Sequence, residues 1–160
     1  MKTLKRVTQG LCVLFSTGFA VQAAEPPRPE YGPDITLEAA KKIAAGVIAE
    51  CTSNKWNVAV AVVNTHGSLV YYERMNNTQS ASAQIAVDKA KVGAMYRRTT
   101  RAFADVIAKT GPAVMTLPGV VASPGGVPVM VGARVIGGVG VSGVTGDQDE
   151  QCSKAGLAGM

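Results

Sequence analysis

The chain has 160 residues, which is enough for one domain with a single hydrophobic core. It contains 16 basic and 11 acidic residues, but three of the basic residues lie within the first six positions, in a segment that we expect to be removed. The remaining 13 basic and 11 acidic residues leave a net charge of only +2, and few residues are aromatic, so we exclude a nucleic-acid partner.

The first 23 residues have the three parts of a secretory signal. A basic start is followed by an apolar run over Leu11–Ala20, and Val21–Ala23 fits a cleavage site. The apolar run is too short for a transmembrane helix, which needs roughly 20 residues. We therefore predict a signal peptide over residues 1–23 and a periplasmic or secreted mature protein. An uncleaved membrane anchor is the alternative.

Residues 24–34 contain four prolines and little that a core could bury. They predict a Pro-rich arm that is extended or lies on another surface. The domain then covers residues 35–160. Thr36 is expected to cap its first helix, in which apolar residues recur at helical spacing from Leu37 to Cys51.

Two β-branched segments, Val58–Asn64 and Leu69–Met75, flank a short Gly-containing turn and predict an antiparallel hairpin. Helices are expected next over Ser80–Arg98 and Thr100–Lys109. In the first of these helices the predicted buried side contains Ala81, Ile85, Val92 and Met95. The cations Lys89, Lys91, Arg97 and Arg98 are expected on or near its polar side.

The last third is divided into short segments by Gly and Pro residues. Strands are predicted over Val127–Val131 and Val135–Ser142, joined by a type II′ turn at Gly132–Ala133. Pro128 cannot donate to a ladder, so its strand is expected at an edge or Pro128 at a strand end. A helix over Gln148–Met160 closes the chain. Hairpins joined to separate helices predict an α+β fold with an antiparallel sheet.

Gly138, Gly140 and Gly143 have the G-x-G-x-x-G spacing of a dinucleotide-binding turn. That turn requires a strand that ends at the first glycine and a helix that begins in the loop. Here the glycines lie inside a predicted strand, and only 17 residues follow Gly143. We therefore reject a dinucleotide site. Gly138 and Gly140 share one strand face, which predicts close approach by a helix or a neighbouring subunit, with a bound ligand as the alternative.

Two cysteines, Cys51 and Cys152, remain after the predicted signal peptide. In an oxidising compartment they either form a disulfide or stay as two buried thiols. Spacing alone does not decide between these states.

Several segments carry a family resemblance: "VAVAVVNTHGSLVYYERM", "SAQIAVDKAKVGAMYRR", "LPGVVASPGGVPVMVGARVIGGVGVSGVTGDQDEQC" and "AGLA". From Ile35 onward the chain resembles the GlcG/HbpS family of haem-binding proteins. The resemblance implies about five antiparallel strands flanked by helices in a PAS- or profilin-like topology. It also implies homo-oligomers from dimers to octamers, and haem binding with slow haem degradation or haem and redox sensing beside a membrane sensor partner. Asn64 stands where the family usually has Asp.

The candidate ligands for haem come from three parts of the chain. His66, the one histidine, is a candidate axial ligand, although a solvated turn residue is the alternative. Arg97, Arg98 and Arg101 are candidate partners of haem propionates, or solvated cations at helix ends. Thr116 is a candidate loop contact, or a hydroxyl bonded to its own backbone.

Acidic residues before the last predicted helix form a further candidate site. Asp147 and Glu150 could bind iron as oxygen ligands. The alternative is that Asp147, Asp149 and Glu150 cap the helix and complement its dipole.

The sequence contains no Ser-His-Asp set, Cys-x-x-Cys pair or His cluster, so whether the protein is an enzyme stays open. The leading hypothesis is an exported haem-binding protein that degrades haem or senses haem or redox state. In that case the cofactor supplies the chemistry and the protein positions it. The alternatives are an accessory protein of glycolate metabolism that binds a small organic acid without haem, and a structural or signalling partner without a small ligand.

Overall fold

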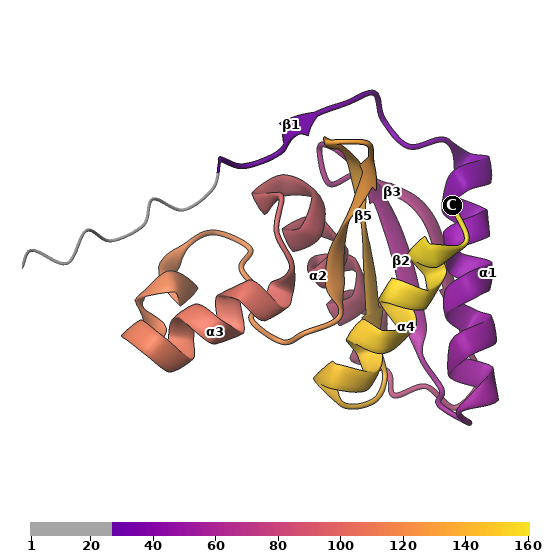
Figure 1. Ribbon diagram of the computed structural model, residues 1–160. Coiled ribbons are helices and arrows are strands. Elements are labelled where there is room, and N and C mark those ends of the chain that lie inside the picture. Colours follow the sequence, from indigo (N-terminus) through magenta and orange to yellow (C-terminus); the bar gives the residue numbers. More distant parts are fainter. Residues whose placement is uncertain (1–26) are drawn as a thin grey trace, which may run out of the picture.

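The computed structural model describes residues 27–160 (Figure 1). The predicted signal peptide and the first three residues of the predicted arm lie outside the described residues. Within them, the elements in chain order are β1 (Glu30–Tyr31), α1 (Leu37–Ser53), β2 (Ala59–Asn64), β3 (Leu69–Arg74), α2 (Ser82–Tyr96), α3 (Thr100–Thr110), the 3-10 helix η1 (Pro112–Thr116), β4 (Gly126–Val131), β5 (Arg134–Ser142) and α4 (Gly146–Ala158).

The strands form one five-stranded sheet in which β5 is central. β2 and β4 both pair with β5 in antiparallel orientation over residues 137–140 of β5, so they lie on opposite sides of it. β3 extends the sheet beyond β2, and β1 pairs in parallel with Arg134 and Val135 of β5. The predicted α+β fold with helices flanking a sheet is confirmed. The arm adds the one parallel pairing, which makes the sheet mixed.

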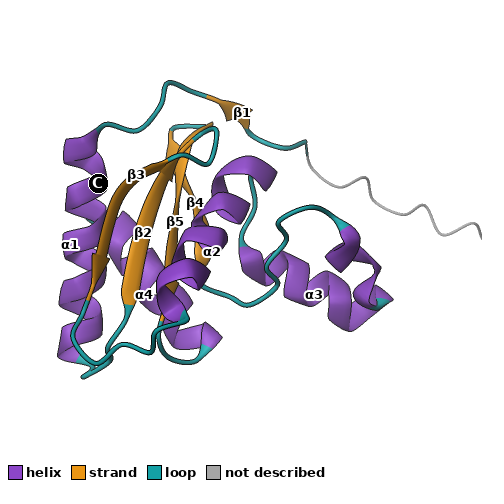
Figure 2. Cartoon of the chain, turned by 180° about the vertical axis from the view of Figure 1, so that it is seen from behind, coloured by secondary structure: helices purple, strands orange, loops and turns teal. Residues whose placement is uncertain are grey.

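The sheet lies between two helical layers (Figures 1 and 2). α1 and α4 cover one face, where the main core includes Val58, Val60 and Val62. α2 covers the other face, where Ala59, Ala61 and Val63 pack with small residues of the helix. This alternation follows from the two-residue period of a strand, which directs neighbouring side chains to opposite faces.

Gly138 and Gly140 allow α2 to lie directly on β5. A Cβ atom at Gly138 would be 2.2 Å from the carbonyl oxygen of Ala90, and one at Gly140 would be 2.1 Å from that of Ala86. The predicted approach of a helix is therefore confirmed. The residues buried on α2 are mostly small, because a glycine surface accepts only small side chains. Of the predicted buried side, Val92 is buried and Ile85 is half-buried, whereas the prediction was wrong for Ala81 and Met95, which are exposed.

Local signals define the other element ends. The predicted type II′ turn requires a positive φ at its first central residue and a negative φ at its second. Gly132 has a φ of 58°, and Ala133 is not among the residues with positive φ, as this turn requires. Pro128 lies on the edge strand β4, as expected. The acidic residues do not provide the N-cap of α4: Thr145 caps it, with Gln148 completing a capping box.

A disulfide between Cys51 and Cys152 joins α1 to α4, with the Cα atoms 5.9 Å apart. Both cysteines are fully buried in the main core. α3 lies beyond α2 and packs through a smaller cluster of Val92, Phe103 and Val120 (Figure 1). Across residues 27–160, none of the helices combines the length and the apolar character that a membrane span needs.

Candidate functional site

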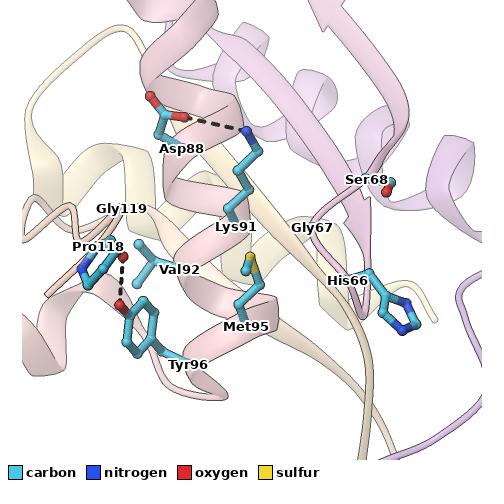
Figure 3. A pocket seen from close by; sticks show the side chains of 10 residues that line it. All are labelled: His66, Gly67, Ser68, Asp88, Lys91, Val92, Met95, Tyr96, Pro118 and Gly119. Carbon is cyan, nitrogen blue, oxygen red and sulfur yellow. Dashed lines mark hydrogen bonds and ion pairs between the residues drawn. The ribbon is translucent and has the colours of Figure 1, made fainter.

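A pocket of about 660 Å³ opens between the β2–β3 turn, α2 and the loop that follows η1 (Figure 3). Its surface is mostly apolar, and its lining residues are His66, Gly67, Ser68, Asp88, Lys91, Val92, Met95, Tyr96, Pro118 and Gly119. A second pocket of about 420 Å³ is lined by Tyr31, Gly32, Thr65, His66 and Met95. His66 and Met95 line both pockets, so the two pockets adjoin.

Local backbone geometry brings the walls of the larger pocket together. Gly67 has a φ of +81°, and a Cβ atom there would lie only 2.7 Å from the sulfur of Met95. Glycine therefore allows both the turn conformation and its close approach to α2. On the opposite wall, the Tyr96 hydroxyl donates to the carbonyl oxygen of Pro118 over 2.6 Å and holds the loop against the helix.

His66 lies at the rim of the two pockets, at the tip of the β2–β3 turn. Its backbone N–H donates to Oδ1 of Asn64 over 3.0 Å, and the same oxygen accepts from the N–H of Ser68 over 2.9 Å. The imidazole is 81% exposed. Figure 3 shows it on the outer side of the turn, directed away from Lys91 and Met95.

The imidazole is connected to Asp34, which belongs to the predicted arm. Nδ1 of His66 lies 3.1 Å from the Thr65 hydroxyl and 3.9 Å from the Asp34 carboxylate. Asp34 accepts hydrogen bonds from the Thr65 hydroxyl, from the Thr65 backbone N–H over 3.0 Å, and from the Asn64 amide over 3.2 Å. The side-chain hydrogen bond from Thr65 is the main cause that lowers the pKa of Asp34 below its ordinary value.

Sequence reasoning did not identify Asp34 as part of this site. The residue is 31 positions before Thr65, and the Pro-rich composition around it indicates only an extended segment. An acidic residue three positions before the first helical residue, Leu37, was the available signal. It could not show which turn the carboxylate would reach.

The three predicted arginines lie at different places. Arg97 donates to the carbonyl oxygen of Pro29 over 2.9 Å and lies 5.0 Å from the ring centre of Tyr31. Arg98 lies 4.6 Å from the ring centre of Phe103. The helix α2 ends at Tyr96, and Arg97 follows it in the left-handed conformation with a φ of 55°. Because their partners differ, the guanidinium groups do not surround one common site.

Arg101 forms ion pairs with Asp147 and Glu150. The predicted propionate partner and the predicted iron ligands therefore bind each other in this structure. Glu150 also pairs with Lys154 over 3.0 Å. In the part of the chain that the structure describes, no group of three or more His, Cys, Asp or Glu residues could hold a metal ion. Thr116 is exposed, and its hydroxyl donates to the carbonyl oxygen of Ala113 over 2.8 Å within η1.

Lys89 does not lie on the polar side of its helix, as the sequence predicted. Its ammonium is buried and donates to Asp149 over 2.8 Å and to the carbonyl oxygen of Val141 over 3.0 Å. Burial raises the pKa of the Asp149 carboxyl, while the hydrogen bond from Lys89 opposes this change. The prediction was wrong because a charged residue on a helix carries no local sign of a distant buried partner.

Comparison with known proteins finds a matching family model and similar sequences. Residues 35–158 match a family model described as "Haem degrading protein HbpS-like". Protein GlcG of Escherichia coli strain K12 is 37% identical over 106 residues, which cover 64% of this chain and 79% of GlcG.

Solved structures have the same fold. A double mutant of HbpS from Streptomyces reticuli has a TM-score of 0.74 and 30% identity, and the match covers 88% of this chain and 97% of that chain. A haem complex of PduOC has a TM-score of 0.72 at 22% identity, covering 79% of this chain and 95% of that chain. The second likeness is one of fold alone.

Proposed function

Because the chain belongs to the HbpS-like family, we propose that it is a haem-binding protein whose haem lies on the surface shared by the two adjoining pockets. One observation carries the proposal: a mostly apolar surface has the single histidine of the chain at its rim. Haem needs apolar contacts for its macrocycle and an axial ligand for its iron. A protein of the same fold, PduOC, has been crystallised with haem.

The residues present fit this cofactor. His66, Met95 and Tyr96 have side chains of the types that ligate haem iron. The Tyr96 hydroxyl donates to the carbonyl oxygen of Pro118, and the Met95 sulfur lies against the turn at Gly67. The His66 ring instead reaches solvent on the outer side of the turn (Figure 3). We therefore assign His66 as the ligand on the side of the smaller pocket, and Met95, which lines both pockets, as an apolar contact. Bound haem would supply the redox chemistry.

Lys91 is the cation best placed for a haem propionate. It lines the larger pocket and is 43% exposed, and its ammonium is 3.9 Å from the carboxylate of Asp88. That distance is long for an ion pair, so a propionate could compete for the ammonium. The proposal therefore assigns the propionate contact to Lys91 rather than to the arginines at the end of α2.

Haem titration of untagged protein comprising residues 24–160 tests the proposal. We expect a saturable Soret band, a changed spectrum and at least about tenfold weaker binding in His66→Ala, and a smaller loss of affinity in Lys91→Gln. Lys109→Gln, on α3 away from the pocket, is the matched control. An unchanged spectrum in His66→Ala would remove His66 as the ligand. The absence of saturable binding in the wild type would overturn the function.

The same measurements test the other functions. Thermal stabilisation by small organic acids but not by haem would favour the organic-acid accessory protein, since a ligand selective for the native state raises its stability. Arg101 is already paired with two carboxylates, so the structure offers that alternative no convergent arginine site. No response to either ligand would favour a structural or signalling partner. Loss of the Soret band over time in the presence of peroxide would extend the function to haem degradation.

We further propose that the protein is exported and forms homo-oligomers. The predicted leader and the disulfide support an oxidising compartment. Exposed apolar side chains near the pockets, among them Tyr31, Met95 and Leu117, support self-association. Cell fractionation with N-terminal sequencing tests export, and light scattering tests assembly. A monomer at micromolar concentration would contradict the second claim.

A further inference from the structure

The β2–β3 turn contains a chain of hydrogen bonds that reaches the proposed haem ligand. Resting on the proposed function, we infer that Asp34 and Thr65 are positioning residues that hold His66 with its proton on Nδ1 and thereby present Nε2 to haem iron. Both residues act through the imidazole, and Thr65 also lines the smaller pocket.

The Thr65 hydroxyl lies between the Asp34 carboxylate and the imidazole of His66. Asp34 accepts the hydroxyl proton in a hydrogen bond and also accepts from two N–H groups, those of the Thr65 backbone at 3.0 Å and the Asn64 side chain at 3.2 Å. Three donors favour the ionised carboxylate, which accepts hydrogen bonds but has no proton to donate. The single hydroxyl proton of Thr65 is therefore directed to Asp34.

The imidazole of His66 lies beside the same hydroxyl, with the Thr65 oxygen 3.1 Å from Nδ1. Because its proton is directed to Asp34, this oxygen can only accept from the ring, so Nδ1 carries the hydrogen. A neutral imidazole has one N–H, so Nε2 keeps its lone pair. Thr65 is only 8% exposed, which restricts its hydroxyl to this geometry, whereas the ring itself reaches solvent.

The arm keeps Asp34 in place beside the turn. Tyr31 donates its hydroxyl to the carbonyl oxygen of Met95 over 2.9 Å, and β1 pairs with the start of β5. Nε2 is thus the free nitrogen of a ring whose other nitrogen is hydrogen-bonded, the arrangement by which proteins orient metal-bound histidines. The geometry assigns the Pro-rich arm a part in the site.

The haem-free protein allows a direct test, because the chain has a single histidine and the spectrum contains one imidazole. Long-range ¹H–¹⁵N spectra of untagged protein report which ring nitrogen carries the hydrogen. They are recorded about two pH units above the ordinary pKa of an imidazole, which is about 6.5, so that the neutral ring is observed. We expect the Nδ1–H form in the wild type and in Thr65→Ser, which keeps the hydroxyl. Thr65→Val removes the acceptor, and we expect it to change to the Nε2–H form.

Two further variants complete the design. Asp34→Ala releases the Thr65 proton to donate to Nδ1, so it is also expected to favour the Nε2–H form. Thr110→Val removes a hydroxyl that bonds only within α3 and is the matched control, with no change expected. Backbone amide spectra identify any variant that has lost its fold. An Nε2–H form in the wild type, or an unchanged tautomer in folded Thr65→Val, would overturn the inference.

Haem titration then separates this inference from the proposed function. We expect Thr65→Val to bind haem about tenfold more weakly with a changed ferric spectrum, and Thr65→Ser to restore both. If the wild type has the Nδ1–H form but binds no haem, the proposed function fails and the hydrogen-bond chain stands. If His66→Ala abolishes the haem spectrum while Thr65→Val has wild-type affinity and tautomer, the function stands and the inference fails.

Discussion

At the scale of single residues, the charge of Asp34 makes stability depend on pH. The hydrogen bond from the Thr65 side chain, and next the one from its backbone, lower the pKa of Asp34 below 3.8. A carboxyl whose folded-state pKa is depressed stabilises the fold above its unfolded pKa, and this contribution is lost as the pH falls through the lower folded value. We expect Asp34→Asn to be less stable than the wild type at neutral pH.

The difference in melting temperature between wild type and Asp34→Asn should shrink as the pH falls below about 4. Thermal unfolding followed by circular dichroism across this range measures it, and Asp105→Asn on α3 is the matched control. A difference in melting temperature that stays constant with pH would show that the charge of Asp34 does not contribute to stability.

The ion pair between Lys89 and Asp149 is buried on both sides, with each side chain only 2% exposed. Removal of one partner leaves an unpaired charge in the interior, so we expect Lys89→Met or Asp149→Asn to lower the free energy of unfolding by about 3–5 kcal/mol. The double variant Lys89→Met/Asp149→Asn should lose less than the sum of the two, because it leaves no buried charge.

Urea unfolding of the wild type, the two single variants and the double variant gives the coupling free energy between Lys89 and Asp149 as a double-mutant cycle. Lys154→Met serves as the control, because the Lys154 side chain is 62% exposed and its pair with Glu150 should contribute less than about 1 kcal/mol. Additive losses in the double variant would contradict coupling between Lys89 and Asp149.

At the scale of elements, contact between α2 and β5 depends on the absence of side chains. A Cβ atom at residue 140 would lie 2.1 Å from the Ala86 oxygen and 2.4 Å from the Ala90 nitrogen, both backbone atoms that cannot move without the helix. We expect Gly140→Ala to destabilise the fold by about 3 kcal/mol or more. Gly159→Ala is the control, because its nearest neighbour would be 3.9 Å away. Equal urea unfolding midpoints for Gly140→Ala and the wild type would contradict this packing.

At the scale of the whole molecule, the Cys51–Cys152 disulfide closes a loop between residues 101 positions apart. A loop of this length restricts the unfolded chain strongly, so we expect the double variant Cys51→Ala/Cys152→Ala to lose about 4 kcal/mol of stability. Urea unfolding with and without a reducing agent measures the loss. The wild type should respond to the reductant and the variant should not, and a wild type that does not respond would contradict the contribution.

Much of the fold could be predicted because its signals are local. The antiparallel β2–β3 hairpin, the turn at Gly132 and the helix cap at Thr36 depend on neighbouring residues, and each occurs where the sequence predicts it. Of the candidate site, the sequence indicated His66 as a candidate ligand through its chemistry, with a solvated turn residue as the alternative. Sequence reasoning missed Lys91 and Met95 as pocket residues, because a helix pattern does not show which exposed side chains will face a turn from another part of the chain.

By itself, the sequence determined the four α-helices, the strands β2 to β5, the α+β class and the rejection of a dinucleotide site, since these follow from periodicity and backbone conformation. It did not indicate β1 or η1. Tertiary structure alone decided which distant polar and charged groups meet. It brought Asp34 to Thr65 across 31 positions and Lys89 to Asp149 across 60, and it directed the three arginines to different partners. The physical reason is that a charged side chain carries no local mark of its partner, because the pairing depends on how the elements pack.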